Sequence, residues 1–155
     1  MHVYVASSWR NAYQPAVVQA LQRAGHTVYD FRHPAPGDEG FRWAAIDPAW
    51  QAWTPAQYRD ALQHPRARVG FAQDHIALQS ADATVLVLPC GRSAHLELGY
   101  AAGLGQRTAV LMLQPDEPEL MYLLCDRVCV SLEELLVFLN DRETSDGVAT
   151  AAPVI

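Results

Sequence analysis

The sequence contains no lysine, and all eleven of its basic residues are arginine. Two kinds of chemistry depend on a lysine side chain: Schiff-base catalysis, in which the amine attacks a carbonyl group, and the Walker-type phosphate loop. The absence of lysine excludes both. The formal net charge is -6, so we expect no basic face for polymeric nucleic acid.

Cysteines are few, and long apolar runs are absent. Cys90, Cys125 and Cys129 are an odd number and form no CxxC pair, so neither a disulfide framework nor a zinc site is favoured. The six histidines show no HExxH or HxH spacing, and we expect neither a metal nor an organic cofactor. Met1 leads directly into a strand pattern, and no apolar run is long enough to span a membrane. We therefore expect a cytoplasmic protein with no membrane partner.

The 155 residues suffice for one domain with a buried core. We expect this domain to span residues 1–140. Residues 141–155 are polar and then alanine-rich without periodicity, which is typical of a disordered tail.

Short apolar stretches alternate with helical patterns, which favours an α/β fold with a parallel sheet. The expected class is a flavodoxin-like, doubly wound, five-stranded parallel sheet with strand order 2-1-3-4-5 and right-handed crossovers. The expected strands are residues 2–6, 26–31, 83–88, 108–113 and 127–130. The expected helices are residues 14–24, 55–63, 70–80, 94–103 and 132–139, with a short helix over 118–125.

Hydroxyl residues precede three of these helical patterns and predict N-caps. They are Thr54, Ser93 and Ser131, the last with Glu134 three residues after it. In the helix over residues 70–80, the apolar side chains predicted to face the core are Phe71, Ile76 and Leu78.

An aromatic-rich insert over residues 32–67 follows the second strand. It holds five prolines and three of the four tryptophans, with Trp43 the first of them. One interpretation is a satellite hydrophobic cluster that packs the insert down. The other is a lid whose aromatic faces, including that of Trp43, stack on a flat ligand such as a nucleobase.

Residues 81–113 form the most informative unit, a buried strand followed by a polar turn, a helix and a second strand. Glu97 is expected in the first turn of that helix, where the helix dipole favours an ionised carboxylate. The turn before it lies at the carboxyl end of a strand, which is where ligands bind in open α/β sheets. The alternative is a surface glutamate that only complements the dipole.

The same edge of the sheet receives the loop after the first strand. We expect Tyr4, Ser8, Arg10, Ser93 and Glu97 to share one cleft with the insert as its roof. Hydroxyls, a guanidinium group and a helix N-terminus together suit an oxyanion or phosphate group. Taken singly, each of these elements is a weak signal, and a serine or an arginine in a turn is more often merely solvated.

Three segments carry a resemblance to a known family: YVASSWR near the start, Asp74 eight residues before Asp82, and SAHLELGYAAGLGQRTAVLM. They resemble the nucleoside 2-deoxyribosyltransferase family, which includes relatives that hydrolyse the N-glycosidic bond of nucleoside monophosphates. The similarity spans about residues 3–131, and ELGYA is its most specific part. The chain departs from the family at residues 105–108, GQRT in place of a GKP-like segment, and its loop before Glu97 is shorter than in the transferases.

The resemblance implies roles for three residues. Glu97 matches the nucleophile, which forms a glycosyl-enzyme ester through an oxocarbenium-like transition state. Asp74 matches the second carboxylate, which protonates or polarises the departing base and works best with a raised pKa. Tyr4 matches a tyrosine that positions the nucleophile. Asp82 is interpreted as structural, at the start of its strand.

The resemblance also implies a substrate. Ser8 and Arg10 match residues that hold the 5′-phosphate in the monophosphate-hydrolysing relatives. Arg92 and Ser93 would complete the site, and Gly91 of the same turn is a further candidate for substrate binding. The expected reaction is therefore cleavage of a (deoxy)nucleoside 5′-monophosphate through Glu97. Two alternatives stay open: base exchange between free deoxynucleosides, and a module that binds a nucleotide without cleaving it.

Glu119 and Met121, in the segment PELMY, match a region that family members contribute to a neighbouring subunit's pocket. That implies a homodimer or a higher homo-oligomer. The alternative is that Leu120, Met121 and Leu123 are core residues.

Overall fold

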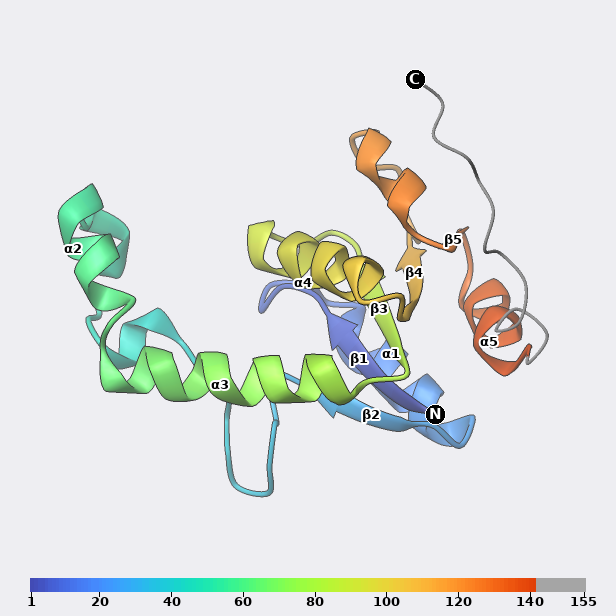
Figure 1. Ribbon diagram of the computed structural model, residues 1–155, viewed down its shortest axis with the longest axis horizontal. Coiled ribbons are helices and arrows are strands. Elements are labelled where there is room, and N and C mark those ends of the chain that lie inside the picture. The colour runs from blue at the N-terminus through green and yellow to red at the C-terminus, as the bar shows by residue number, and fades with distance from the viewer. Residues whose placement is uncertain (142–155) are drawn as a thin grey trace.

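A computed structural model of the chain describes residues 1–141. Its five strands are β1 (His2–Ala6), β2 (Thr27–Asp30), β3 (Ala83–Val87), β4 (Arg107–Leu111) and β5 (Arg127–Cys129). They form one sheet in the order β2-β1-β3-β4-β5, and every pair is parallel (Figure 1). The flavodoxin-like, doubly wound fold predicted from the sequence is confirmed. The tail predicted over 141–155 lies, from residue 142 onward, outside the described residues.

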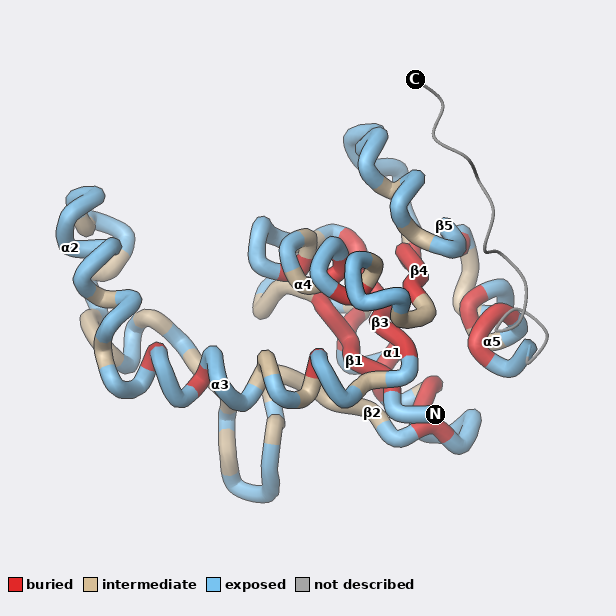
Figure 2. Tube along the Cα trace, in the orientation of Figure 1, coloured by how far each residue is buried: buried red, intermediate tan, exposed pale blue. Residues whose placement is uncertain are grey.

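Helices cover both faces of the sheet. One face packs against α1 (Gln14–Arg23) and α5 (Leu132–Asn140), and the other against α3 (Pro65–Ser80) and α4 (Arg92–Gly103). The central strands are buried on both sides and appear as the interior of the molecule in Figure 2. Because side chains alternate along a strand, Val3 and Val5 face the α1–α5 layer while Tyr4 faces α3 and α4.

Side chains fix the ends of several elements, in addition to the backbone hydrogen bonds between strands. Asp82 accepts a 2.7 Å hydrogen bond from the backbone N–H of His2 through Oδ2, which confirms its structural role. Ser131 caps α5 by accepting from the N–H of Glu134, as predicted. The segment before β5 is a 3₁₀ helix, η3 (Leu120–Leu124).

The burial predicted for α3 is wrong at two positions. Phe71 and Ile76 are 66% and 67% exposed, although Leu78 is buried as expected. The helix starts at Pro65, five residues before the predicted start, and its buried positions are Ala67, Gly70 and Leu78. These share one helical face with Asp74, so a carboxylate lies in the stripe that faces inward. Phe71 and Ile76 point away from the sheet.

The start of α4 also differs from the prediction. Gly91 is the N-cap residue, in extended conformation, and the helix begins at Arg92. Ser93 is therefore the second helical residue, and its side chain makes no capping hydrogen bond. Glu97 is the sixth residue of α4 and lies in the second turn. The prediction that Ser93 caps the helix and that Glu97 lies in its first turn is wrong.

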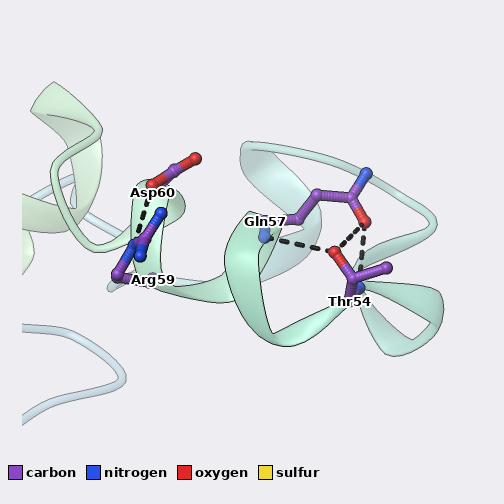
Figure 3. Close-up of polar contacts among 4 residues, drawn as sticks. All are labelled: Thr54, Gln57, Arg59 and Asp60. Carbon is purple, nitrogen blue, oxygen red and sulfur yellow. Dashed lines mark hydrogen bonds and ion pairs between the residues drawn. The ribbon is translucent and has the colours of Figure 1, made fainter.

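The insert forms two short 3₁₀ helices, η1 (Trp43–Ala45) and η2 (Trp50–Ala52), and the helix α2 (Pro55–Ala61). Figure 1 shows α2 beyond the N-terminal end of α3, away from the sheet. The predicted cap at Thr54 is confirmed as a capping box, in which Thr54 and Gln57 bond reciprocally (Figure 3). The Arg59–Asp60 ion pair in the same view is exposed and contributes little.

Candidate active site

Two tyrosines lie side by side on the face of the sheet that α3 and α4 cover. Tyr4 of β1 and Tyr29 of β2 are register partners, and their rings stack with centroids 5.2 Å apart. Tyr4 is completely buried, and its buried hydroxyl makes no hydrogen bond of standard geometry. Burial, followed by the charges of Glu97 and Asp74, raises the pKa of Tyr4, so its hydroxyl stays neutral and can donate.

Tyr29 connects the tyrosine pair to α3. Its hydroxyl donates a 2.8 Å hydrogen bond to Oδ1 of Asp74. Burial raises the pKa of the Asp74 carboxyl, and the charge of Asp38 adds to that rise, while the hydrogen bond from Tyr29 opposes it. The raised pKa predicted for Asp74 is confirmed in direction.

Glu97 faces the same tyrosines from α4. Burial, reinforced by the charge of Asp74, raises the pKa of its carboxyl to about 7, while the neighbouring Tyr4 hydroxyl, which favours the ionised form, opposes the rise. The prediction that the helix N-terminus favours ionisation is therefore wrong in direction. The dipole effect falls off beyond the first turn, and Glu97 is one turn further along in a partly desolvated place.

The two carboxyl groups interact through their charges. Because the charge of Asp74 raises the pKa of Glu97, loss of the first proton from the pair makes the second harder to remove. Over an intermediate pH range the pair holds one proton. A pair that holds one proton offers an acid and a nucleophile at the same site.

The loop after β1 is fastened to the end of β3. Ser7 Oγ donates to the Val87 carbonyl at 2.9 Å, and the buried Asn11 amide donates to the carbonyls of Val87 and Pro89 at 3.0 and 3.1 Å. Residues 7–11 therefore lie beside the turn that leads into α4. The structure thus brings together the two loops from which the sequence drew its candidate phosphate ligands.

Arg32, at the start of the insert, holds the same loop from the other side. Its Nη2 donates to the backbone carbonyls of Ser8 and Asn11 at 2.7 and 2.8 Å. Ser8 Oγ accepts from the backbone N–H of Arg10 at 3.2 Å. The guanidinium group of Arg10 is exposed and, within residues 1–141, makes no contact with another side chain. Gly91 and Ser93 are also exposed, at the start of α4.

Trp43 lies in a separate aromatic cluster. Its ring packs edge-on against Phe41 and Trp53, with centroids 4.8 and 5.7 Å away, and contacts Tyr58 at 6.0 Å. Phe41 in turn packs against Gly70 of α3. These contacts are those of the satellite cluster, and they do not join Trp43 to the carboxyl pair.

Met121 lies on η3 and is 58% exposed, as are Leu120 and Leu123 at 74% and 83%. The alternative that these three are core residues is wrong. Tyr122 is the residue of η3 that turns inward, and its hydroxyl lies 2.9 Å from Nε2 of His95.

His95 was not singled out from the sequence, nor was Tyr29. His95 Nδ1 lies 3.0 Å from the Gly91 carbonyl, so the ring ties the first turn of α4 to η3. Burial and the charges of Asp116 and Glu97 raise the pKa of the nearby Cys90 thiol to about 12, which favours the protonated form at neutral pH. The contacts of His95 and Tyr29 are with residues far away in the sequence, which no local pattern indicates. Only the register of β1 and β2 could have indicated Tyr29.

Within residues 1–141, no three or more His, Cys, Asp or Glu side chains gather in a way that could hold a metal ion. Every helix in that range is too short or too polar to cross a membrane.

The chain is similar in structure to a 2-deoxyribosyltransferase from the psychrotolerant bacterium Bacillus psychrosaccharolyticus, with a TM-score of 0.57 and 18% identity, over 88% of this chain and 90% of that one. The CMP N-glycosidase BcmB of Clostridium botulinum aligns with a TM-score of 0.45 and 14% identity, over 90% of this chain and 98% of the other. Neither a protein-family model nor a curated protein matches the chain. The similarity to the transferase is one of fold, and it confirms the fold that the sequence resemblance implied.

Proposed function

We propose that this protein is an enzyme that cleaves the N-glycosidic bond of a (deoxy)nucleoside 5′-monophosphate. The observation that carries the proposal is the pair of carboxyl groups, Glu97 and Asp74, beside two stacked tyrosines. Tyr29 donates a hydrogen bond to Asp74, and the Tyr4 hydroxyl favours the ionised form of Glu97. A purely structural role does not account for two partly buried carboxyl groups, of which the charge of Asp74 raises the pKa of Glu97. The sequence resemblance to the nucleoside 2-deoxyribosyltransferase family supports the same assignment.

In the first step the Glu97 carboxylate attacks the anomeric carbon of the sugar, and the bond from that carbon to the base breaks. The proton of Asp74 moves to the departing base, which leaves neutral. The product is a glycosyl ester of Glu97 and an Asp74 carboxylate. The Tyr4 hydroxyl positions Glu97 by donating to its ionised form.

In the second step the Asp74 carboxylate takes a proton from water while the water oxygen attacks the anomeric carbon. The ester bond breaks, Glu97 returns as a carboxylate, and the sugar 5-phosphate leaves. The net reaction consumes one water and restores one proton to the pair. The active enzyme is therefore the form with one proton on the pair, and kcat/KM should fall as pH rises through about 7, where the pair loses that proton.

The exposed guanidinium group of Arg10 favours a nucleotide over a free nucleoside. It lies in the loop that carries Ser8, beside the turn with Gly91 and Ser93, and it has no partner in residues 1–141. An arginine fork and the N–H groups at a helix start suit a phosphate dianion. Trp43 would reach a bound base only if the insert moved toward the pair.

We also propose a homodimer or a higher homo-oligomer. Phe71 stacks on His75, which contacts Tyr100 of α4, so an apolar face continues from α3 to α4 and includes Leu96, 76% exposed. The exposed residues of η3, among them Met121, add a second apolar area. Contiguous exposed apolar surface of this kind marks an interaction site.

The experiment is a panel of nucleoside 5′-monophosphates and free nucleosides, incubated with the protein and chromatographed for free base. We expect release of base from a monophosphate, and its loss in Glu97→Gln. Glu133→Gln, an exposed glutamate on α5, is the matched control and should retain full turnover. Full turnover in Glu97→Gln would refute the proposal.

Adding a second free base to each reaction separates hydrolysis from transfer, because transfer yields a new nucleoside or nucleotide. Thermal stabilisation by one nucleotide, without release of base from any, would instead identify a binding module.

A further inference from the structure

The turn over residues 8–11 keeps three hydrogen-bond donors unused. The backbone N–H of Asn11 donates to the Ser8 carbonyl at 3.0 Å, which closes the turn. The N–H of Arg10 donates to Ser8 Oγ at 3.2 Å, so this hydroxyl accepts one hydrogen bond and its own proton is left to donate. The N–H of Trp9 makes no hydrogen bond to any of residues 1–141. The Ser8 hydroxyl, the Trp9 N–H and the Arg10 guanidinium group are therefore consecutive free donors.

Arg32 holds this turn at both of its ends. Its Nη2 donates to the carbonyl of Ser8, the first residue of the turn, at 2.7 Å, and to that of Asn11, the last, at 2.8 Å. A peptide group is planar and trans, so its N–H points opposite to its C=O. The bond to the Ser8 carbonyl therefore directs the N–H of Trp9 away from Arg32. A charged donor on the carbonyl also polarises the peptide group, which strengthens its N–H as a donor.

Arg32 is itself held by its neighbours. Its backbone N–H donates to Oδ1 of Asp30 at 3.0 Å, and Nε2 of the fully buried Gln14 donates to the same oxygen at 2.7 Å. Its guanidinium carbon lies 5.8 Å from the ring centroids of both Trp9 and Phe31, which pack edge-on. Within residues 1–141 the guanidinium group forms no ion pair. Its hydrogen bonds in that range go only to the two carbonyls of the turn.

The loop between β2 and η1 closes against the same rings. Gly40 has a φ of +71°, and a Cβ at this position would lie 2.2 Å from the Phe31 carbonyl oxygen and 3.1 Å from Cζ2 of Trp9. The N–H of Gly40 donates to Oδ1 of Asp38 at 2.9 Å. Beyond this closure, the guanidinium carbon of the exposed Arg42 lies 4.1 Å from the centroid of the Trp9 ring. Arg42 is thus a second cation beside Trp9, and it donates to neither carbonyl of the turn.

We propose that Arg32 is a positioning residue for the phosphate group of the substrate, an inference that rests on the proposed function. By holding both ends of the turn, it presents the Ser8 hydroxyl, the Trp9 N–H and the Arg10 guanidinium group to one phosphate dianion. Hydroxyls, backbone N–H groups and an arginine fork are donors that suit phosphate oxygens. Arg32 does not touch the substrate, and it acts on the affinity for the nucleotide through the turn.

The test is Arg32→Met, which keeps an apolar stem between the two rings and removes both hydrogen bonds to the turn. KM for the monophosphate should rise about tenfold, roughly the value of one hydrogen bond to a charged group, and kcat should change less than about twofold. A loss of the folded fraction would instead lower kcat and leave KM in place. That result would show that Arg32 only supports the fold, and the inference would be wrong.

Arg42→Met is the matched control, since it removes a positive charge from beside the same Trp9 ring and leaves the turn with its donor. It should change KM less than about twofold. An equal rise of KM in both variants would show that local charge matters and the position of the turn does not, which overturns the inference.

Arg32→Lys decides the question if Arg32→Met does not fold. It keeps the positive charge, but its side chain is shorter and lacks the planar fork, so it should not hold both carbonyls. We expect KM for the monophosphate to rise about threefold or more. An unchanged KM in Arg32→Lys would show that the charge alone suffices, against the inference.

A titration with inorganic phosphate needs no turnover and separates this inference from the proposed function. The amide signals of Trp9 and Arg10 are followed by ¹⁵N NMR at constant ionic strength in the parent protein and both methionine variants. They should shift at similar phosphate concentrations in the parent and in Arg42→Met, whereas Arg32→Met should need about tenfold more. Unmoved signals in the parent, or equal concentrations in all three proteins, would overturn the inference even in an active enzyme. A protein that releases no base overturns the proposed function and leaves this titration to decide on Arg32.

Discussion

Tyr29 donates a hydrogen bond to Asp74, while the hydroxyl of its stacked neighbour Tyr4 favours the ionised form of the other carboxyl group, that of Glu97. The two tyrosines come from adjacent parallel strands, and one step of register in either strand would turn its side chain to the opposite face of the sheet. The pairing of β1 with β2 thus fixes which phenol reaches which carboxyl group.

Tyr29→Phe removes the donor to Asp74 and keeps the ring stack. Because that hydrogen bond favours ionised Asp74, its loss should raise the pKa of Asp74. The acid limb of the pH–rate profile should move to higher pH. Tyr58→Phe, an exposed tyrosine of α2, is the control. A shift of the acid limb to lower pH in Tyr29→Phe would contradict the assignment.

Glu97→Gln should stabilise the folded protein at alkaline pH. The folded pKa of Glu97 is about 7, raised from 4.5, so the unfolded chain releases this proton more readily. Its contribution to stability is present below pH ~4.5 and is lost as pH rises through about 7. Allowing for partial exposure, we expect the free energy of unfolding of Glu97→Gln to exceed that of the parent protein by about 2 kcal/mol at pH 8.5.

Denaturant unfolding at pH 4.5 and 8.5 measures this gain. The difference in the free energy of unfolding between Glu97→Gln and the parent protein should be small at pH 4.5 and should reach its expected value at pH 8.5. An equal difference at both values would show that the substitution acts through packing and not through charge. Glu133→Gln should show no such dependence on pH.

Gly40→Ala should destabilise the loop that holds Asp38. The added Cβ would lie 2.2 Å from the Phe31 carbonyl oxygen, in a left-handed conformation that itself costs about 1 kcal/mol. We expect a loss of more than about 2 kcal/mol in the free energy of unfolding measured by denaturant. Gly37→Ala is the control: its φ is +80° but nothing lies within 4 Å of the new atom, so only the conformational cost remains.

Phe71→Asp combined with Leu96→Asp places two charges on the exposed face of α3 and α4. If copies of the chain associate through this face, the double variant should sediment as a smaller species than the parent protein, because burying an unpaired charge is costly. Val137→Asp, at a 64% exposed position on α5, is the control and should leave the association unchanged. Identical sedimentation of the double variant and the parent would place the contact elsewhere.

The fold was predictable from the sequence because its strands are short apolar runs separated by helical patterns, and β3 is buried along its whole length. The site was predictable in part. Glu97, Asp74 and Tyr4 were identified through the family resemblance, and the structure brings all three together. Periodicity alone placed Phe71 and Ile76 inside, since it gives weight to large apolar residues, whereas the inner face of α3 is built from Ala67, Gly70 and Leu78 around Asp74.

What the sequence did not reveal depends on distances between separate elements. The turn Cys90 to Ser93 holds several residues able to start a helix, so the start of α4, and with it the turn that holds Glu97, was misplaced. Tyr29 and Asp38 act through a strand register and a loop closure, neither of which leaves a local pattern. The raised pKa of Glu97 likewise follows from burial and a neighbouring charge.

The closure of the loop at Gly40 has an evolutionary consequence. Residues 34–37 form its outer part, and the loop joins the rest of the molecule near Phe31, Gly40 and Gln73. Insertions or deletions in that outer part leave the sheet, Glu97 and both tyrosines in place. In a lineage of such proteins, the pKa of Asp74, which the charge of Asp38 helps to raise, could therefore diverge by changes in one surface loop while Glu97 stays the same.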